Sequence, residues 1–147
     1  MQTVCARRNF LLACIASGAA FTVPTRSFAA ERIKIRDLWG AGGEFSPLAT
    51  QVSGRTVELQ GYMAPPLKPE MSFFVLTRIP MAVCPFCDTE AAWPNDLIVV
   101  YCDHALALVN FNELIRVSGR LETGTKTDPE TGLVSRVRLM QADYVLA

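Results

Sequence analysis

Residues 55–63 read RTVELQGYM, a run in which apolar side chains alternate with polar ones around a glycine. Alternation at every second residue is typical of a β-strand with one buried face, and here it places Val57, Leu59 and Tyr62 on that face. Gly61 lies inside the run, where a bulge or a sharp coil of a small barrel is expected. This stretch predicts a fold built from short, strongly curved strands.

Four further stretches predict strands, and turn residues separate them. They are residues 71–79 (MSFFVLTRI), 97–101 (LIVVY), 115–122 (IRVSGRLE) and 133–142 (LVSRVRLMQA). The prolines of 64–70 and the polar run 123–132 predict turns, while 105–114 fits either a short helix or an irregular crossover. Five strands, with glycine inside two of them and one longer crossover, favour an all-β, five-stranded OB-like Greek-key barrel.

The apolar positions of these five runs are expected to form one core. They are Val57, Leu59, Phe73, Val75, Leu97, Val99, Val117, Leu121, Val137 and Leu139, with Gln141 on the same face of the last strand. Ser46 and Pro47 predict a short helix over 45–52, because serine caps helices and proline suits their first turn. We therefore expect an N-terminal arm and helix at 31–53 and a barrel at 54–147.

Residues 1–30 have the composition of a cleavable export signal. Arg7 and Arg8 precede an apolar run, and Ser27-Phe28-Ala29 supplies small residues for cleavage. The paired arginines followed by a polar residue, Phe and Leu resemble a twin-arginine signal, with the general secretory route as the alternative. The apolar run is shorter than the ~20 residues that span a bilayer. The sequence predicts a periplasmic protein without a stable membrane span in its mature form.

Removal of the signal changes both the charge and the cysteine count. The signal carries three arginines and no acidic residue, so 11 basic and 14 acidic residues remain. No basic excess is left to indicate nucleic-acid binding. Cys5 and Cys14 leave with the signal, and three cysteines remain. An odd number in an oxidising compartment indicates a free thiol, an intermolecular bridge or a metal site.

The three remaining cysteines and the single histidine form the pattern C-x2-C-x14-C-x-H. Its members are Cys84, Cys87, Cys102 and His104. Two ligands from a tight turn and two from a second segment suit a tetrahedral zinc ion, with copper as the next choice for these soft ligands. Asp88 and Asp103 are candidates to hydrogen-bond the ligands from outside the site.

Three alternatives to the metal site stay open. Cys84 and Cys87 could form a structural disulfide, or a redox-active dithiol, although no Lys or Arg lies between Arg78 and Arg116 to lower a thiol pKa. The barrel could instead be an OB-type binding module whose long loop is closed by a disulfide. Four protein ligands would close the metal coordination sphere, which favours a structural or carrier role over catalysis.

Several short motifs occur together in this chain. They are GYMAPP at 61–66, the apolar strand at 73–76, the cysteine-bearing proline loop and VSGRL at 117–121. Their order resembles a family of small exported bacterial proteins of uncharacterised function, over about residues 54–142. The resemblance implies a barrel fold and a role in periplasmic metal handling, with a periplasmic or transporter protein as partner.

Overall fold

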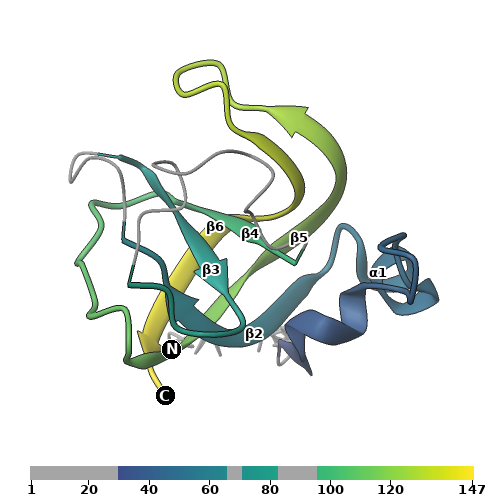
Figure 1. Cartoon of the computed structure of the whole chain (residues 1–147), viewed down its shortest axis with the longest axis horizontal. Coiled ribbons are helices and arrows are strands. Elements are labelled where there is room, and N and C mark those ends of the chain that lie inside the picture. Colours follow the sequence, from purple (N-terminus) through teal and green to yellow (C-terminus); the bar gives the residue numbers. More distant parts are fainter. Residues whose placement is uncertain (1–29, 66–70, 83–95) are drawn as a thin grey trace, which may run out of the picture.

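A six-stranded sheet is the main structural element of residues 30–65, 71–82 and 96–147, which a computed structural model describes (Figure 1). The strands are β1 (Glu31–Ile33), β2 (Thr56–Met63), β3 (Phe73–Thr77), β4 (Ile98–Cys102), β5 (Leu114–Thr127) and β6 (Val134–Leu146). The helical elements of these residues are the 3-10 helix η1 (Ile35–Leu38) and the α-helix α1 (Pro47–Val52). The predicted mainly β fold is confirmed. The predicted export signal, up to residue 29, lies outside the described residues.

Strand β2 is the centre of the sheet because it pairs with three other strands. Its side chains alternate between buried and more exposed, with Val57 and Leu59 buried as predicted. The prediction was wrong for Tyr62, because the strand continues regularly through Gly61 and buries Met63 instead. It runs parallel to β1 and antiparallel to β5, and its last residues also pair with β3. A Cβ atom at Gly61 would lie 2.5 Å from the carbonyl oxygen of Thr77. The register with β5 continues from Thr56 to Tyr62, so Gly61 allows close approach of β3 and forms no bulge.

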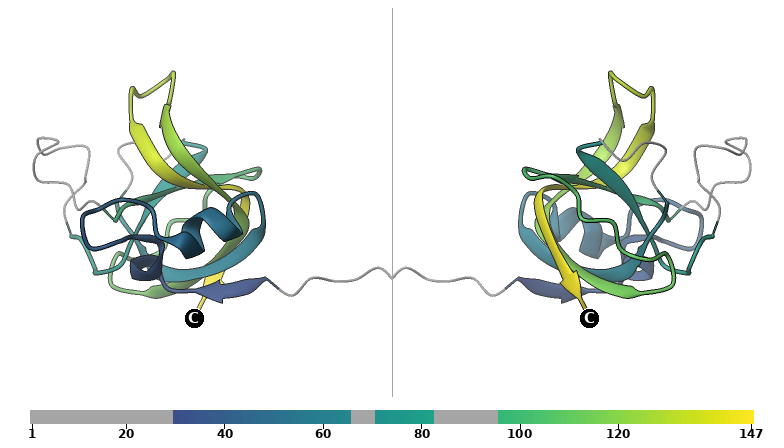
Figure 2. Two further views of the ribbon diagram at one scale, coloured as in Figure 1. Left: turned by 90° about the vertical axis from the view of Figure 1, so that its right-hand side faces the viewer. Right: turned by 90° about the vertical axis from the view of Figure 1, so that its left-hand side faces the viewer.

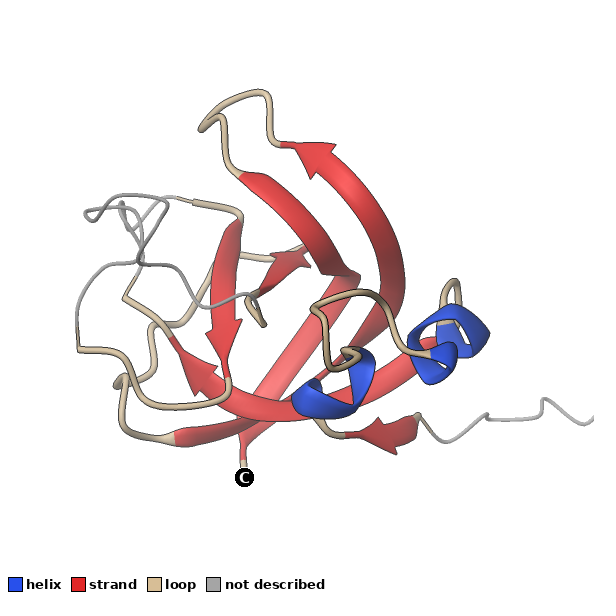
Figure 3. Ribbon diagram, turned by 45° about the vertical axis from the view of Figure 1, so that its right-hand side comes forward, coloured by secondary structure: helices blue, strands red, loops and turns tan. Residues whose placement is uncertain are grey.

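The last strand in the sheet order pairs back to β2. The sheet runs β1-β2-β3-β4-β6-β5, and β2 also pairs with β5. Within this sheet β4 and β6 are parallel, whereas β3–β4 and β5–β6 are antiparallel. Figure 3 shows these strands curving around the interior, with the helical segments on one side near β1 and β2. The curvature brings strands that are distant in sequence around a common core.

The N-terminal segment packs into this core. The Ser46 side chain accepts a hydrogen bond from the Ala49 N–H at 3.1 Å and caps α1, which confirms the predicted helix. Ala49 and Val52 are fully buried on its inner face. Strand β1 adds a sixth strand to the five expected, and the register pairs Ile33 with Leu59 of β2.

Strands β3 and β4 face the core with the opposite residues from those predicted. The main core contains Phe74, Leu76, Ile98 and Val100, whereas Phe73 and Val99 form a separate cluster with Leu133. Val75 is buried outside the main core, and Leu97 is only partly buried. The prediction of one core was wrong here because both strands are apolar at nearly every position. An apolar run of this kind has no alternation to identify its inner face.

The β5–β6 hairpin is longer than the sequence indicated. Strand β5 continues to Thr127, although residues 123–132 were expected to form a turn. The turn itself spans Asp128 to Gly132, whose N–H donates to the Asp128 carbonyl at 2.9 Å. Figure 2 shows that the end of the hairpin rises above the rest of the sheet. The polar side chains of this part of β5 are therefore partly or fully exposed to solvent while its backbone stays paired with β6. Residues 105–112 contain no helix, in agreement with the irregular-crossover alternative.

Candidate functional site at the end of strand β4

Cys102 and His104, two of the four predicted ligands, lie at the carboxyl end of β4. Cys102 is the last residue of the strand, and its N–H donates to the Ser72 carbonyl at 3.0 Å. The residue is 7% exposed and belongs to the main core. His104 follows two residues later, and its side chain is 51% exposed. The strand end therefore presents one buried thiol and one accessible imidazole.

A bulge in β6 shapes the surroundings of this strand end. Gln141 has a φ of 52°, a left-handed conformation that is uncommon outside glycine. The registers with β4 and with β5 both shift here. A Cβ atom at Gly119 of β5 would lie 3.0 Å from that of Ala142, so the glycine accommodates the bulged strand. Gln141 was predicted to face the core, but the bulge leaves it exposed and buries Ala142 instead.

The bulge also carries the next two residues of β6 towards His104. The His104 Nε2 atom lies 4.0 Å from an oxygen of Asp143, and its ring stacks on Tyr144 with centroids 6.1 Å apart. The Tyr144 hydroxyl accepts a hydrogen bond from the Ala107 N–H at 2.7 Å and donates to the Ala107 carbonyl at 2.8 Å. Tyr144 thereby holds the segment after His104 against β6. Bulges that redirect side chains are frequent near functional sites.

The charges around Cys102 are negative. Burial raises the pKa of the Cys102 thiol to about 11, and the nearby carboxylates of Asp143 and Asp103 add to the rise. Burial likewise raises the pKa of the Tyr144 hydroxyl, helped by the thiol and Asp143 and opposed by its bond from the Ala107 N–H. The thiol is therefore protonated at neutral pH in this environment. A bound cation would reverse that preference, because metal coordination deprotonates a thiol.

The other two predicted metal ligands lie outside the described part of the chain. Cys84, Cys87 and Asp88 lie in 83–95, outside the described residues. Within the described ranges, no three Cys, His, Asp or Glu side chains are grouped closely enough to hold a metal ion. Asp103 is exposed between Cys102 and His104. A complete site would require both cysteines of the preceding connection.

The pairing of β3 with β4 sets a distance that this connection would have to cover. The two strands are antiparallel, so the connection begins and ends at the opposite end of β4 from Cys102. Arg78 and Asp96, which flank it, form an ion pair at 3.0 Å. Five residues of β4 span ~16 Å, and the six residue-to-residue steps from Arg78 to Cys84 reach at most about 20 Å when extended. The chain is long enough to return Cys84 to Cys102.

Sequence reasoning singled out Cys102 and His104 as candidate ligands but missed their neighbours. Asp143 and Tyr144 were not singled out, because regular alternation through residue 142 gave no reason to expect β6 to bend. The run MQAD offered one weak signal, since a polar glutamine followed by a small residue interrupts the apolar face. A bulge formed by a glutamine with positive φ has no reliable sequence signature.

Comparison with known proteins relates the chain to one fold. No protein-family model and no curated protein sequence matches it. A crystal structure of a DUF3299 family protein from Pseudomonas aeruginosa PAO1 is similar, with a TM-score of 0.54 and 15% sequence identity, over 81% of this chain and 97% of that chain. At this identity the similarity concerns the fold alone. That family is known by a DUF number rather than by an activity, in keeping with the expected resemblance.

Proposed function

We propose that this protein is an exported, non-catalytic metal-binding protein in which Cys84, Cys87, Cys102 and His104 hold one ion, with zinc as the best fit. The observation that carries the proposal is the placement of Cys102 and His104 at one strand end beside Asp143. A thiol and an imidazole among carboxylates attract a cation, and zinc takes these ligands. The C-x-x-C pair would supply the other two ligands.

The proposed architecture is a five-stranded OB-like barrel with β1 added at its edge. It is supported by the pairing order β2-β3-β4-β6-β5, which returns to β2, and by the parallel β4–β6 pair. Greek-key barrels of this kind carry ligands on loops at the strand ends. The proposed metal site would lie at such an end, where β4 ends and the bulged β6 stops pairing with it.

A four-ligand site favours a carrier or structural role. Three thiolates and one imidazole leave no open position on a tetrahedral ion, so substrate has no place to bind the metal. We propose that the ion is either cargo or a clamp on the loop at 83–95, and that the protein acts in the periplasm with a metal-handling or transport partner. Export through the twin-arginine route would allow the ion to be inserted before translocation.

The redox alternative concerns Cys84 and Cys87 rather than Cys102. A thiol whose pKa is about 11 is a poor nucleophile at neutral pH, which makes Cys102 unsuited to resolving a mixed disulfide. If Cys84 and Cys87 formed a disulfide, Cys102 and His104 would have no shared role with them. The two proposals therefore differ in whether the strand end and the loop behave as one unit.

The test compares zinc content and melting temperature in single variants. With one shared ion, Cys84→Ser, Cys102→Ser and His104→Ala should each lose stoichiometric zinc and lower the melting temperature to a similar extent, because metal binding contributes to folding. Asn112→Ala, at an exposed position of the same connection after β4, is the matched control and should keep the zinc.

A structural disulfide gives another pattern. Cys84→Ser and Cys87→Ser would then be equally harmful, His104→Ala would be mild, and a reductant rather than a chelator would lower the melting temperature. If chelation leaves the melting temperature unchanged and fewer than two thiols titrate in the purified protein, the metal proposal is wrong. Loss of disulfide-exchange activity without loss of stability would instead identify a redox dithiol.

A further inference from the structure

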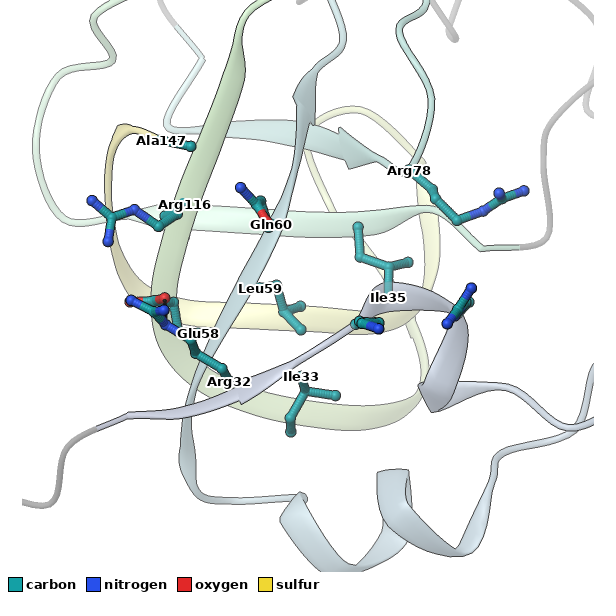
Figure 4. A pocket seen from close by; sticks show the side chains of 11 residues that line it. Arg32, Ile33, Ile35, Glu58, Leu59, Gln60, Arg78, Arg116 and Ala147 are labelled. Carbon is teal, nitrogen blue, oxygen red and sulfur yellow. Dashed lines mark hydrogen bonds and ion pairs between the residues drawn. The ribbon is translucent and has the colours of Figure 1, made fainter.

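A second candidate site lies on the other side of the sheet, over strand β2. A groove of about 750 Å³ opens between β2 and the β1–η1 segment. Figure 4 shows Ile35, Leu59 and Gln60 in the middle of this groove, Arg32, Glu58 and Arg116 towards one end, and Arg78 at the other end. Ile35 and Leu59 are buried core residues beneath the groove, and charged side chains lie at its ends. It shares no residue with the strand end that carries Cys102.

The charges around the groove are mainly positive. Its lining contains the basic residues Arg32, Lys34, Arg36, Arg78 and Arg116, and one acidic residue, Glu58. The chain after the export signal has more acidic than basic residues, so this positive charge is concentrated locally. A cavity lined by one sign of charge raises the local concentration of ions of the opposite sign.

Three of these basic groups already have carboxylate partners. Arg32 pairs with Glu58 at 2.6 Å, Arg36 with Asp37 at 3.4 Å and Arg78 with Asp96 at 3.0 Å. All three arginines are more than half exposed, so water screens these pairs and leaves the groups able to turn towards a ligand. Lys34 and Arg116 have no carboxylate partner among the described residues. These two cations are available to an added anion.

Arg116 is held in a position suited to an oxyanion. It pairs with Gln60 across β2 and β5, which places the two side chains next to each other on one face of the sheet. The Arg116 Nε atom is buried, and no hydrogen-bond acceptor in the described chain reaches it. A guanidinium group donates hydrogen bonds and accepts none, so an unpaired buried N–H needs an acceptor from elsewhere. The amide of Gln60 adds a further donor beside it.

A second unpaired donor borders the same region. The Trp39 Nε1 atom is buried without a partner among the described residues. Trp39 lines a neighbouring cavity of about 530 Å³, which shares Arg36 and Arg78 with the groove. Arg116 and Trp39, which line the two adjoining cavities, thus each carry a buried N–H group without an acceptor among the described residues. Buried donors are rarely left unpaired, and such exceptions indicate a missing partner.

We propose that this groove binds a small organic anion, with its carboxylate or phosphate group on Arg116, Gln60 and Lys34. A guanidinium fork recognises both kinds of oxyanion. The groove volume of about 750 Å³ is much larger than a simple inorganic anion and falls in the range of small-molecule sites, which favours an organic anion. This binding is separate from the proposed metal site, and either can hold without the other.

The test adds phenyl phosphate or benzoate to the purified protein at low ionic strength and measures probe binding by ¹H–¹⁵N NMR. Either probe should shift the Arg116 Nε–H and the Gln60 side-chain amide in a saturable manner. Benzyl alcohol, which has a similar ring and no charge, should leave both signals in place. Inorganic phosphate should bind more weakly than phenyl phosphate, because it fills less of the groove and makes fewer contacts with its walls.

Variants assign the effect to the groove. Arg116→Gln should weaken probe binding roughly tenfold or more, since a charge-assisted pair is lost. Lys34→Gln changes an exposed residue and should also weaken it, which keeps the test valid if Arg116→Gln misfolds. Arg120→Gln, on the same strand but outside the groove lining, is the matched control and should bind as the original chain does.

Several results would overturn the proposal. Equal binding of benzyl alcohol would show that the anionic group is not recognised. An equal loss of binding in Arg120→Gln would show that only the overall charge matters. If neither probe shifts the Arg116 or Gln60 signals up to their solubility limit, or if the protein binds anionic phospholipid vesicles and neither small probe, the groove is not a site for a small organic anion.

Discussion

Strands β3 and β4 are buried at nearly every residue, whereas strand β5 alternates between buried and more exposed residues. The hairpin that joins β5 to β6 extends beyond the core (Figure 1). All five residues of β3 are buried, and so are four of the five in β4. In β5 the buried residues alternate up to Leu121, and none is buried from Glu122 to Thr127. The difference shows that neighbouring strands of one sheet can be stabilised in two ways, by two apolar clusters or by one cluster and a polar turn.

Among substitutions on the two sides of β3, we expect the largest loss of stability at Phe74. Phe74→Ala should lower the free energy of unfolding by about 3–5 kcal/mol, because it removes a fully buried ring from the main core. Phe73→Ala should cost at least about 1 kcal/mol less, since its smaller cluster includes the half-buried Met71 and Tyr101, which can move into the space. Urea unfolding at neutral pH measures both.

The exposed Val134 supplies a control for this comparison. Val134→Ala should change the free energy of unfolding by less than ~0.5 kcal/mol, because the side chain lies outside both clusters. If Phe73→Ala costs as much as Phe74→Ala, the two clusters form one energetic unit, and the division of β3 into two faces has no consequence for stability.

The same difference explains how far the sequence predicts this fold. Val57 and Leu59 of β2, and Val117 and Leu121 of β5, lie in the main core as expected, because alternation with polar residues identifies the inner face. Strands β3 and β4 have apolar residues at nearly every position, so the sequence does not identify their inner face. At the candidate metal site, the cysteine and histidine spacing identified Cys102 and His104. Their neighbours on β6 depend on a bulge, which alternation does not reveal.

The turn of the β5–β6 hairpin depends on the carboxylate of Asp128. Its oxygens accept hydrogen bonds from the Thr131 hydroxyl at 2.9 Å, the Thr131 and Glu130 N–H groups at 3.0 and 3.1 Å, and the Tyr101 hydroxyl at 3.1 Å. The last bond connects the turn to β4. Asp128→Ala should therefore cost about 1–3 kcal/mol of stability, and Tyr101→Phe, which removes one bond, about 1 kcal/mol.

This contribution should depend on pH. Burial acts to raise the pKa of Asp128, but the hydrogen bonds from Thr131, Tyr101 and Glu130 outweigh it and hold the pKa below its ordinary value. A carboxylate with a lowered folded-state pKa stabilises the protein above its unfolded-state pKa and loses that effect as the pH falls through the folded-state pKa. The stability gap between the original chain and Asp128→Asn should be constant from pH 7 to about 5 and should narrow below about 4. A gap that widens with acid would contradict this assignment.

The smallest effect concerns Cys102, where the covered strand β4 meets the bulged β6. Because burial raises its pKa to about 11, the thiol should react slowly with iodoacetamide at pH 8 and faster as the pH approaches 11. The measurement needs the mature chain with Cys84 and Cys87 replaced by Ser, so that one thiol remains. When the same chain is unfolded in urea, the pH dependence of alkylation should give an ordinary thiol pKa for Cys102.

Asp143→Asn then separates burial from charge at this position. Burial is the larger cause of the raised pKa and the Asp143 carboxylate the smaller one, so removal of that charge should increase the alkylation rate at pH 9 by only a few fold. Glu130→Gln, at the exposed hairpin turn, should leave the rate unchanged. An increase as large as that produced by unfolding would mean that charge controls the thiol. The end of β4 would then be an open, acidic site rather than an extension of the covered strand, and its capacity to hold a cation would not depend on the burial of Cys102.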